Sequence, residues 1–173
     1  TSALFLVGKA LNWNKQTNVA CPAMSFLASS NSILFHSAKP IFVDISLKDY
    51  CIDPSLLERA IKKNKKIKFV IITDYAGHPA NWIELRKLAN KYKLLLINDN
   101  CHSIGSKIKN NIGYASKYAD IVVHSYHPVK TITTGEGGAI FVKDKSIYKK
   151  ILFLKNLYMK KKLSKYDVEV DDL

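Results

Sequence analysis

Residues 69–99 of this chain, FVIITDYAGHPANWIELRKLANKYKLLLIND, contain two apolar runs separated by a helical pattern. The runs Phe69–Thr73 and Leu94–Ile97 are uniformly apolar, which is typical of strands buried on both faces. Between them, residues 80–92 have a helical spacing of the apolar side chains Trp82, Leu85, Leu88 and Ala89. A strand, a helix and a second strand in this order predict parallel strands covered by helices.

The same alternation extends over most of the chain. We expect helices at residues 2–13 and 25–36 and from Pro54 through Ile61, with Ser25 and Asp53 as the N-caps of the last two. Further strands are expected at residues 18–21, 41–43, 119–123 and 139–142. The fold class is therefore α/β, and we predict a three-layer α/β/α domain with a mostly parallel central sheet.

The composition favours a single globular core and argues against nucleic-acid binding. The chain has 173 residues and a net charge of +13, but only Arg59 and Arg86 are arginines. Lysines cluster at residues 62–68, 143–150 and 155–165. Readout and stacking of bases favour arginine and aromatic side chains, which are not interleaved with these clusters. We interpret the clusters as solvated helix ends and expect no nucleic-acid partner.

The cysteines and histidines give no sign of a disulfide framework or a metal site. Cys21, Cys51 and Cys101 are an odd number without a C-x-x-C pair, so a reducing cytoplasm is expected. His124 and His127 lie three residues apart, but no nearby cysteine or acidic residue completes a zinc set. We therefore expect no metal. No apolar run approaches the length that crosses a bilayer, so we also expect no membrane partner.

Polar side chains follow three of the predicted strands. Asp74 follows one, Asp99 follows the next, and Ser125 and Lys130 come after residues 119–123. Taken singly, an aspartate in such a place is often a helix cap or a turn residue. Together these side chains supply what pyridoxal phosphate (PLP) requires, which is a lysine for an imine and a carboxylate that keeps the ring nitrogen protonated. Small hydroxyls and N–H groups at a helix start would hold its phosphate.

Several segments resemble the sugar aminotransferases of the DegT/StrS group, which have the aspartate aminotransferase fold (fold type I). The most specific are Asp99-x-x-His102-x-x-Gly105, Ser125-Tyr126-His127-Pro128-x-Lys130 and Thr133-Thr134-Gly135-Glu136-Gly137-Gly138. Further segments that resemble motifs of this group lie upstream, at residues 1–4, 21–31, 40–44 and 74–77. The resemblance therefore spans nearly the whole chain.

The resemblance implies a role for each matching residue. Lys130 would form the imine with PLP and move a proton, and Asp99 would contact the pyridine nitrogen. The remaining cofactor-binding residues would be Thr1, Ser2 and Ser125 at the phosphate, Phe26 on the ring face and His102 beside the cofactor. Asp74 would lie close by, in an undefined role. Cys101, next to His102, is expected to be structural.

The resemblance further implies a PLP-dependent transfer of an amino group from glutamate to a nucleotide-linked 4-keto-6-deoxy sugar in surface glycan biosynthesis. Dehydratase relatives have histidine in place of the lysine, so Lys130 favours amino transfer. Residues 74–77 and 127–134 most resemble the 4-aminotransferases of the pseudaminic acid pathway. Other fold type I activities (a lyase or a desulfurase), a non-catalytic family member and a nucleic-acid-binding module remain as alternatives.

The resemblance also predicts how the chain is organised. Family members are about twice as long and have active sites at a dimer interface, so a homodimer is expected. We expect residues 1–157 to be a PLP-binding large domain truncated at its N-terminus. Residues 158–173 would begin a connection to a missing small domain. The absence of an initiator methionine and the polar ending agree with a chain cut at both ends.

Overall fold

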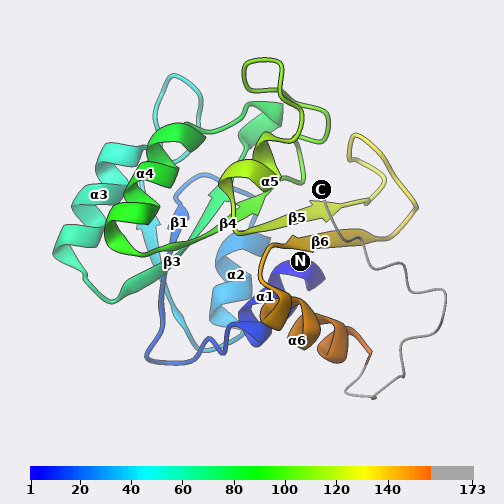
Figure 1. The fold of residues 1–173 in the computed structure, drawn as a ribbon, viewed down its shortest axis with the longest axis horizontal. Helices are drawn as coiled ribbons and strands as arrows, with labels where there is room; N and C mark the ends of the chain where they lie inside the picture. Colours follow the sequence, from blue (N-terminus) through cyan, green and yellow to red (C-terminus); the bar gives the residue numbers. More distant parts are fainter. Residues whose placement is uncertain (157–173) are drawn as a thin grey trace.

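The computed structural model describes residues 1–156. Within them, strands form one six-stranded sheet in the order β2-β1-β3-β4-β5-β6 (Figure 1). All neighbours are parallel except β5 and β6, which are antiparallel. The strands are β1 (Asn18–Pro22), β2 (Lys39–Val43), β3 (Ile67–Thr73), β4 (Leu95–Asp99), β5 (Ile121–Ser125) and β6 (Gly138–Val142). The prediction of a mostly parallel sheet is confirmed.

Helices cover both faces of the sheet, as the predicted three-layer arrangement requires. The helices on one face are α1 (Ser2–Ala10), α2 (Ala28–Leu34) and α6 (Lys145–Lys155). Those on the other face are α3 (Pro54–Lys63), α4 (Trp82–Tyr92) and α5 (Tyr114–Tyr118). A short 3-10 helix, η1 (Tyr75–Gly77), follows β3.

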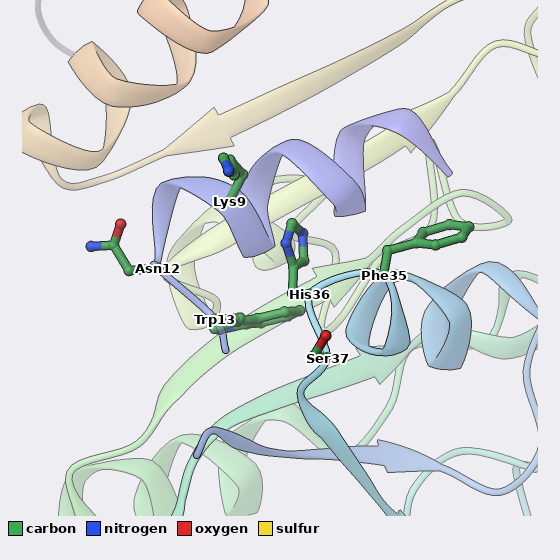
Figure 2. A pocket seen from close by; sticks show the side chains of 6 residues that line it. All are labelled: Lys9, Asn12, Trp13, Phe35, His36 and Ser37. Carbon is green, nitrogen blue, oxygen red and sulfur yellow. The ribbon is translucent and has the colours of Figure 1, made fainter. Parts of the chain in front are cut away.

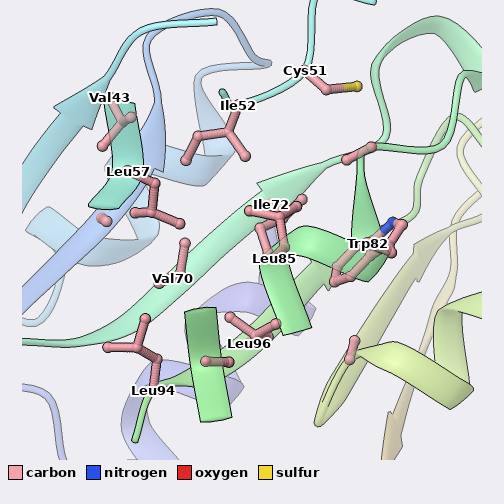
Figure 3. Packing of buried hydrophobic residues seen from close by; sticks show 14 of the residues in the cluster. Val43, Cys51, Ile52, Leu57, Val70, Ile72, Trp82, Leu85, Leu94 and Leu96 are labelled. Carbon is pink, nitrogen blue, oxygen red and sulfur yellow. The ribbon is translucent and has the colours of Figure 1, made fainter. Parts of the chain in front are cut away.

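Successive strand residues point to opposite faces, so each strand contributes to two separate cores. In β3 and β4, Ile72 and Leu96 pack beneath α4, against the fully buried Trp82 and Leu85 (Figure 3). Ile71 and Ile97 face the other way and pack against α1 and α2 through Val7 and Ile33, among others. Burying side chains of this size contributes about 1.5–3 kcal/mol each, which fixes the carboxyl ends of β3 and β4 relative to both helix layers.

Two predicted helices are shorter than expected. The helix predicted for residues 2–13 ends at Ala10, because Asn12 adopts a left-handed conformation (φ 57°) that turns the chain towards Trp13. The prediction of Ser25 as an N-cap is wrong: its hydroxyl donates to the carbonyl of Phe26 at 3.2 Å, and α2 begins only at Ala28. Asp53, in contrast, caps α3 as predicted.

The sequence interpretation missed α5 and α6. Helix α6 lies in one of the lysine clusters, and its apolar residues Ile147, Ile151 and Leu154 contact the core on the face of α1. The lysines there occupy the solvent side of this helix. The predicted connection at residues 158–173 lies outside the described residues. Within residues 1–156, no helix combines the length and apolar character that a membrane span needs.

Candidate active site

The candidate site lies at the carboxyl edge of the sheet, where β3, β4 and β5 end together. Thr73 is the register partner of Asp99, and Asp99 is in turn the partner of Val123. The residues that follow these strands are therefore gathered at one edge, which is where open α/β sheets hold their ligands. This confirms that the strand ends bring Asp74 and Asp99 to the same edge of the sheet.

Asp99 is a buried carboxylate that points towards α2. The Ser29 hydroxyl in α2 donates to its Oδ2 at 3.1 Å, and the Cys101 backbone N–H donates to its Oδ1 at 3.4 Å. Only 5% of the residue is exposed. Both carboxylate oxygens thus have a donor, and the orientation of the group is fixed from the helix on one side and the turn on the other.

Lys130 lies on the loop between β5 and β6 and is half-buried. Its Nζ lies 6.0 Å from the centroid of the Phe26 ring, which is itself 65% exposed. The carbonyl of Tyr126 anchors this loop by accepting hydrogen bonds from the Thr133 hydroxyl and the Thr134 N–H, both at 3.0 Å. A lysine on an anchored loop beside an exposed aromatic ring presents its amine in a defined place.

His102 lies near both Asp99 and Lys130. Its pKa is lowered from the ordinary value, mainly by burial and then by the positive charge of Lys130, while the charge of Asp99 opposes the shift. Both charges therefore act on the same imidazole. Its Nδ1 is buried and has no hydrogen-bond partner within residues 1–156. The ring also makes an edge contact with Tyr75, with centroids 6.3 Å apart.

The pKa of the Cys101 thiol shows which charged groups lie near this part of the site. Burial is the main cause of the strong rise in the pKa of its thiol, and the negative charge of Asp99 adds to it. The positive charge of Lys130 opposes the rise, and the backbone nitrogen of Thr1 lies within electrostatic range of the same thiol. The start of α1 therefore lies in the same neighbourhood as Lys130 and Asp99. A thiol whose pKa is raised in this way is a poor nucleophile, in agreement with the predicted structural role.

The predicted phosphate-binding residues lie at the ends of two elements. Thr1 and Ser2 stand exposed at the beginning of α1, and the Thr1 side chain makes no capping hydrogen bond. Helix α1 packs against β5 and β6. Ser125 is the last residue of β5, and its hydroxyl accepts from the His127 N–H at 3.5 Å. Their contact with a phosphate remains a prediction.

Two features of the site differ from the sequence interpretation or go beyond it. Asp74 lies at the same edge of the sheet as Asp99. Its side chain, however, is fully buried beneath α4 and α5, on the opposite face of the sheet. Ser29, the partner of Asp99, was not singled out from the sequence. It lies within residues 21–31, which carry part of the family resemblance, and this was the available signal.

The structure also contains a pocket away from this edge. Figure 2 shows its lining residues, which are Lys9, Asn12, Trp13, Phe35, His36 and Ser37. They lie where α1 and α2 end and lead into β1 and β2, that is, at the amino edge of the sheet. None of the predicted site residues lines this pocket. In the part of the chain that the structure describes, no three His, Cys, Asp or Glu side chains are grouped as a metal site.

The layered fold, with a lysine, an acid and hydroxyl residues at the carboxyl edge of its sheet, is the fold of the fold type I aminotransferases. A solved structure of NtdA from Bacillus subtilis with bound cofactor PMP superposes with a TM-score of 0.78 and 35% sequence identity, over 87% of this chain and 33% of that chain. PseC of Helicobacter pylori, an aminotransferase involved in pseudoaminic acid biosynthesis, gives a TM-score of 0.80 and 28% identity, over 100% of this chain and 46% of that chain. The resemblance to fold type I enzymes is thus confirmed at the level of the fold.

Sequence comparison identifies the family. Residues 1–170 match the model of the DegT/DnrJ/EryC1/StrS aminotransferase family, and the chain belongs to this family. It is 36% identical to the UDP-4-amino-4,6-dideoxy-N-acetyl-beta-L-altrosamine transaminase of Campylobacter jejuni (serotype O:23/36), over 90% of this chain and 41% of that protein. It is 34% identical to the GDP-perosamine synthase of Escherichia coli O157:H7, over 90% of this chain and 42% of that protein. The chain therefore spans about two fifths of the length of these relatives.

Proposed function

We propose that the protein transfers an amino group from glutamate to the keto group of a nucleotide-linked 4-keto-6-deoxy sugar, using PLP bound at Lys130. One observation carries this proposal: Asp99 ends β4, and Lys130 lies on the loop that follows the neighbouring strand β5, with its Nζ 6.0 Å from the centroid of the Phe26 ring. The charges of both residues also act on the half-buried imidazole of His102. A lysine and a carboxylate gathered in this way are suited to hold a single aromatic cofactor.

The residues present suit PLP in chemistry as well as in place. Asp99 already has donors on both carboxylate oxygens, from Ser29 and the Cys101 N–H, which fix the orientation of the group. An anionic carboxylate can keep a proton on a pyridine nitrogen. The buried Nδ1 of His102 lacks a partner within residues 1–156 and suits a polar group of a bound molecule.

When bound, PLP supplies an aldehyde that combines with amines and a ring that accepts the electrons of a deprotonated carbon. The protein supplies the other functions. Lys130 holds the cofactor and, once free, moves a proton as a general base and acid. Asp99 holds the proton on the ring nitrogen. Phe26 covers one face of the ring, and the N–H groups at the start of α1, with Thr1, Ser2 and Ser125, bind the phosphate.

Two named relatives support a nucleotide-sugar acceptor. The similar Campylobacter jejuni protein is a transaminase of a UDP-linked amino sugar, and the similar Escherichia coli protein is a GDP-perosamine synthase. We place the reaction in surface glycan biosynthesis, in the cytoplasm and in a homodimer. Exposed apolar side chains next to the site suit a partner subunit, among them Phe26, Leu27, Val129 and Ile132.

Borohydride reduction tests the cofactor assignment. The full-length protein is mixed with PLP, reduced and digested, and the phosphopyridoxyl mass is mapped by mass spectrometry. We expect the label on Lys130 alone, and we expect no label at this site in Lys130→Ala. A label confined to a different lysine would overturn the assignment. Incubation of the PLP form with glutamate separates amino transfer from lyase chemistry, because only transfer produces 2-oxoglutarate and the amino form of the cofactor in equal amounts.

A further inference from the structure

Asp74 is the most heavily hydrogen-bonded side chain near the site, although it does not face the site. The N–H of Ala80 and Nε1 of Trp82 donate to its Oδ1 at 2.9 and 2.8 Å. Its Oδ2 accepts from Nδ2 of Asn98 at 3.0 Å, Nδ2 of Asn100 at 2.9 Å and the hydroxyl of Tyr114 at 2.8 Å. An aspartate that merely caps a helix or forms a surface turn has no need of such a set of buried donors.

The two asparagines are the residues on either side of Asp99. Because side chains alternate along a strand, Asn98 and Asn100 point to the α4 face, where Asp74 binds them, and Asp99 points to the α2 face. The backbone adds two further links: the N–H of Asp74 donates to the carbonyl of Asp99 at 3.3 Å, and the Ser103 hydroxyl donates to the carbonyl of Asp74 at 2.9 Å. The segment that presents Asp99 is thus held from behind by Asp74.

The anchorage of Asn98 depends on this carboxylate. Oδ1 of Asn98 is buried and has no partner within residues 1–156, so the bond from Nδ2 to Asp74 is what holds its amide there. Burial raises the pKa of Asp74, and hydrogen bonds, that of Asn98 among them, act against the rise. Within residues 1–156 the donors to Asp74 are all neutral, so hydrogen bonds rather than an ion pair orient its carboxyl group.

We propose that Asp74 is a positioning residue, which fixes Asn98 in β4 and Asn100 just after it on one side of the sheet, so that Asp99 is presented to the cofactor on the other. The inference rests on the proposed function for the role of Asp99, but the placement of the segment is independent of it. Another donor to Asp74, Trp82, offers a matched control. Trp82→Phe removes one donor to Asp74 and leaves its bonds to Asn98 and Asn100 in place. Tyr114→Phe is less suitable, because the Tyr114 hydroxyl also accepts from Nδ2 of Asn100 at 3.1 Å.

The experiment compares Asp74→Ala with Trp82→Phe in the full-length protein. In the cofactor-free form, hydrogen exchange of the amides of residues 99–103 should be faster than in the wild type by about tenfold or more in Asp74→Ala, and unchanged in Trp82→Phe. After addition of PLP, the pH midpoint of the visible absorption of the bound cofactor should shift by about one unit in Asp74→Ala only, because the ring nitrogen loses its aligned carboxylate. Equal changes in both variants would show that Asp74 only stabilises the fold, and would overturn the inference.

Asn98→Ala serves as a second variant if Asp74→Ala does not fold, because it breaks one link to β4 and leaves the carboxylate in place. It should show faster exchange of residues 99–103 and a shifted midpoint, each to a smaller extent. Behaviour identical to the wild type would count against the proposal. If the wild type takes up no PLP at Lys130, the proposed function fails, whereas the exchange comparison still decides whether Asp74 positions the segment.

Discussion

The hydroxyl of Ser29 donates a hydrogen bond to Oδ2 of Asp99 across 3.1 Å, although the two residues are 70 positions apart in the sequence. The contact joins α2 to the end of β4. Ser29 is fully buried, so water does not compete for its hydroxyl. The orientation of Asp99, which is proposed to contact the pyridine nitrogen of PLP, therefore depends on the packing of α2, a helix that contributes no catalytic group of its own.

We expect Ser29→Ala to weaken PLP binding. A buried hydrogen bond to a charged group contributes about 1.5 kcal/mol or more, which corresponds to an increase of about tenfold in the dissociation constant. Absorbance titration of the cofactor-free, full-length protein with PLP measures this constant. Ser32→Ala is the matched control, because Ser32 is also buried in α2 but donates to the carbonyl of Ser29, at 3.0 Å. An equal loss of affinity in both variants would contradict the role given to Ser29.

Lys130→Gln should raise the pKa of His102. The positive charge of Lys130 is the second cause, after burial, of the lowered pKa of this imidazole, so its removal returns the pKa towards the ordinary value. Titration of the cofactor-free protein by NMR measures the change. His124 is the internal control, because burial alone lowers its pKa and no charge contributes. A shift of the same size at both histidines would point to a general rearrangement.

The same imidazole makes stability depend on pH. Because its folded pKa lies below the ordinary 6.5, the unfolded chain takes up the proton first. The contribution of His102 to the free energy of unfolding is therefore complete above pH 6.5 and is lost as the pH falls below this value. Denaturant unfolding of the wild type and of His102→Gln at several pH values should give a difference that changes only below pH 6.5. A constant difference throughout would contradict this.

Much of the fold follows from local pattern, whereas the orientations at the site do not. The apolar runs that became β3 and β4 predicted the strand ends, and with them the gathering of Asp74 and Asp99. A uniformly apolar strand carries no alternation, however, so the sequence does not reveal which helix layer each residue faces. Asp99 faces the layer of α2, where it binds Ser29, and Asp74 faces the layer of α4, where it binds Trp82. These orientations depend on contacts with residues distant in the sequence. Helix α6 was missed for another reason: its four lysines led to an interpretation as solvated charge, although five apolar side chains lie among them.

Capping of α3 gives a prediction at low pH. The Asp53 carboxylate accepts from the N–H groups of Ser55 and Leu56 at 2.7 and 3.0 Å, and its pKa is lowered, chiefly by the Ser55 hydroxyl. Asp53→Ala should cost about 1 kcal/mol of unfolding free energy at pH 7. This stabilisation is present above the ordinary pKa of 3.8 and is lost as the pH falls through the folded pKa. Asp53→Asn should keep most of the cap and lose its pH dependence; a pH-dependent Asn variant would show that another group titrates.

Gly138 permits the close approach of β6 to β5 beside the site. It pairs with Ser125, and an added Cβ would lie 2.7 Å from the carbonyl oxygen of His124, which is backbone and cannot rotate away. Gly138→Ala should therefore lower the free energy of unfolding by about 1–3 kcal/mol and weaken PLP binding, because the strand end that carries Ser125 must shift.

Gly135→Ala is the control on the same loop: its Cβ meets no atom within 4 Å, and only its φ of +77° makes alanine unfavourable. We expect the control to lose about 1 kcal/mol of stability and to keep its affinity for PLP, as measured by denaturant unfolding and absorbance titration. Unchanged affinity in Gly138→Ala would show that the spacing of β5 and β6 does not control the cofactor site.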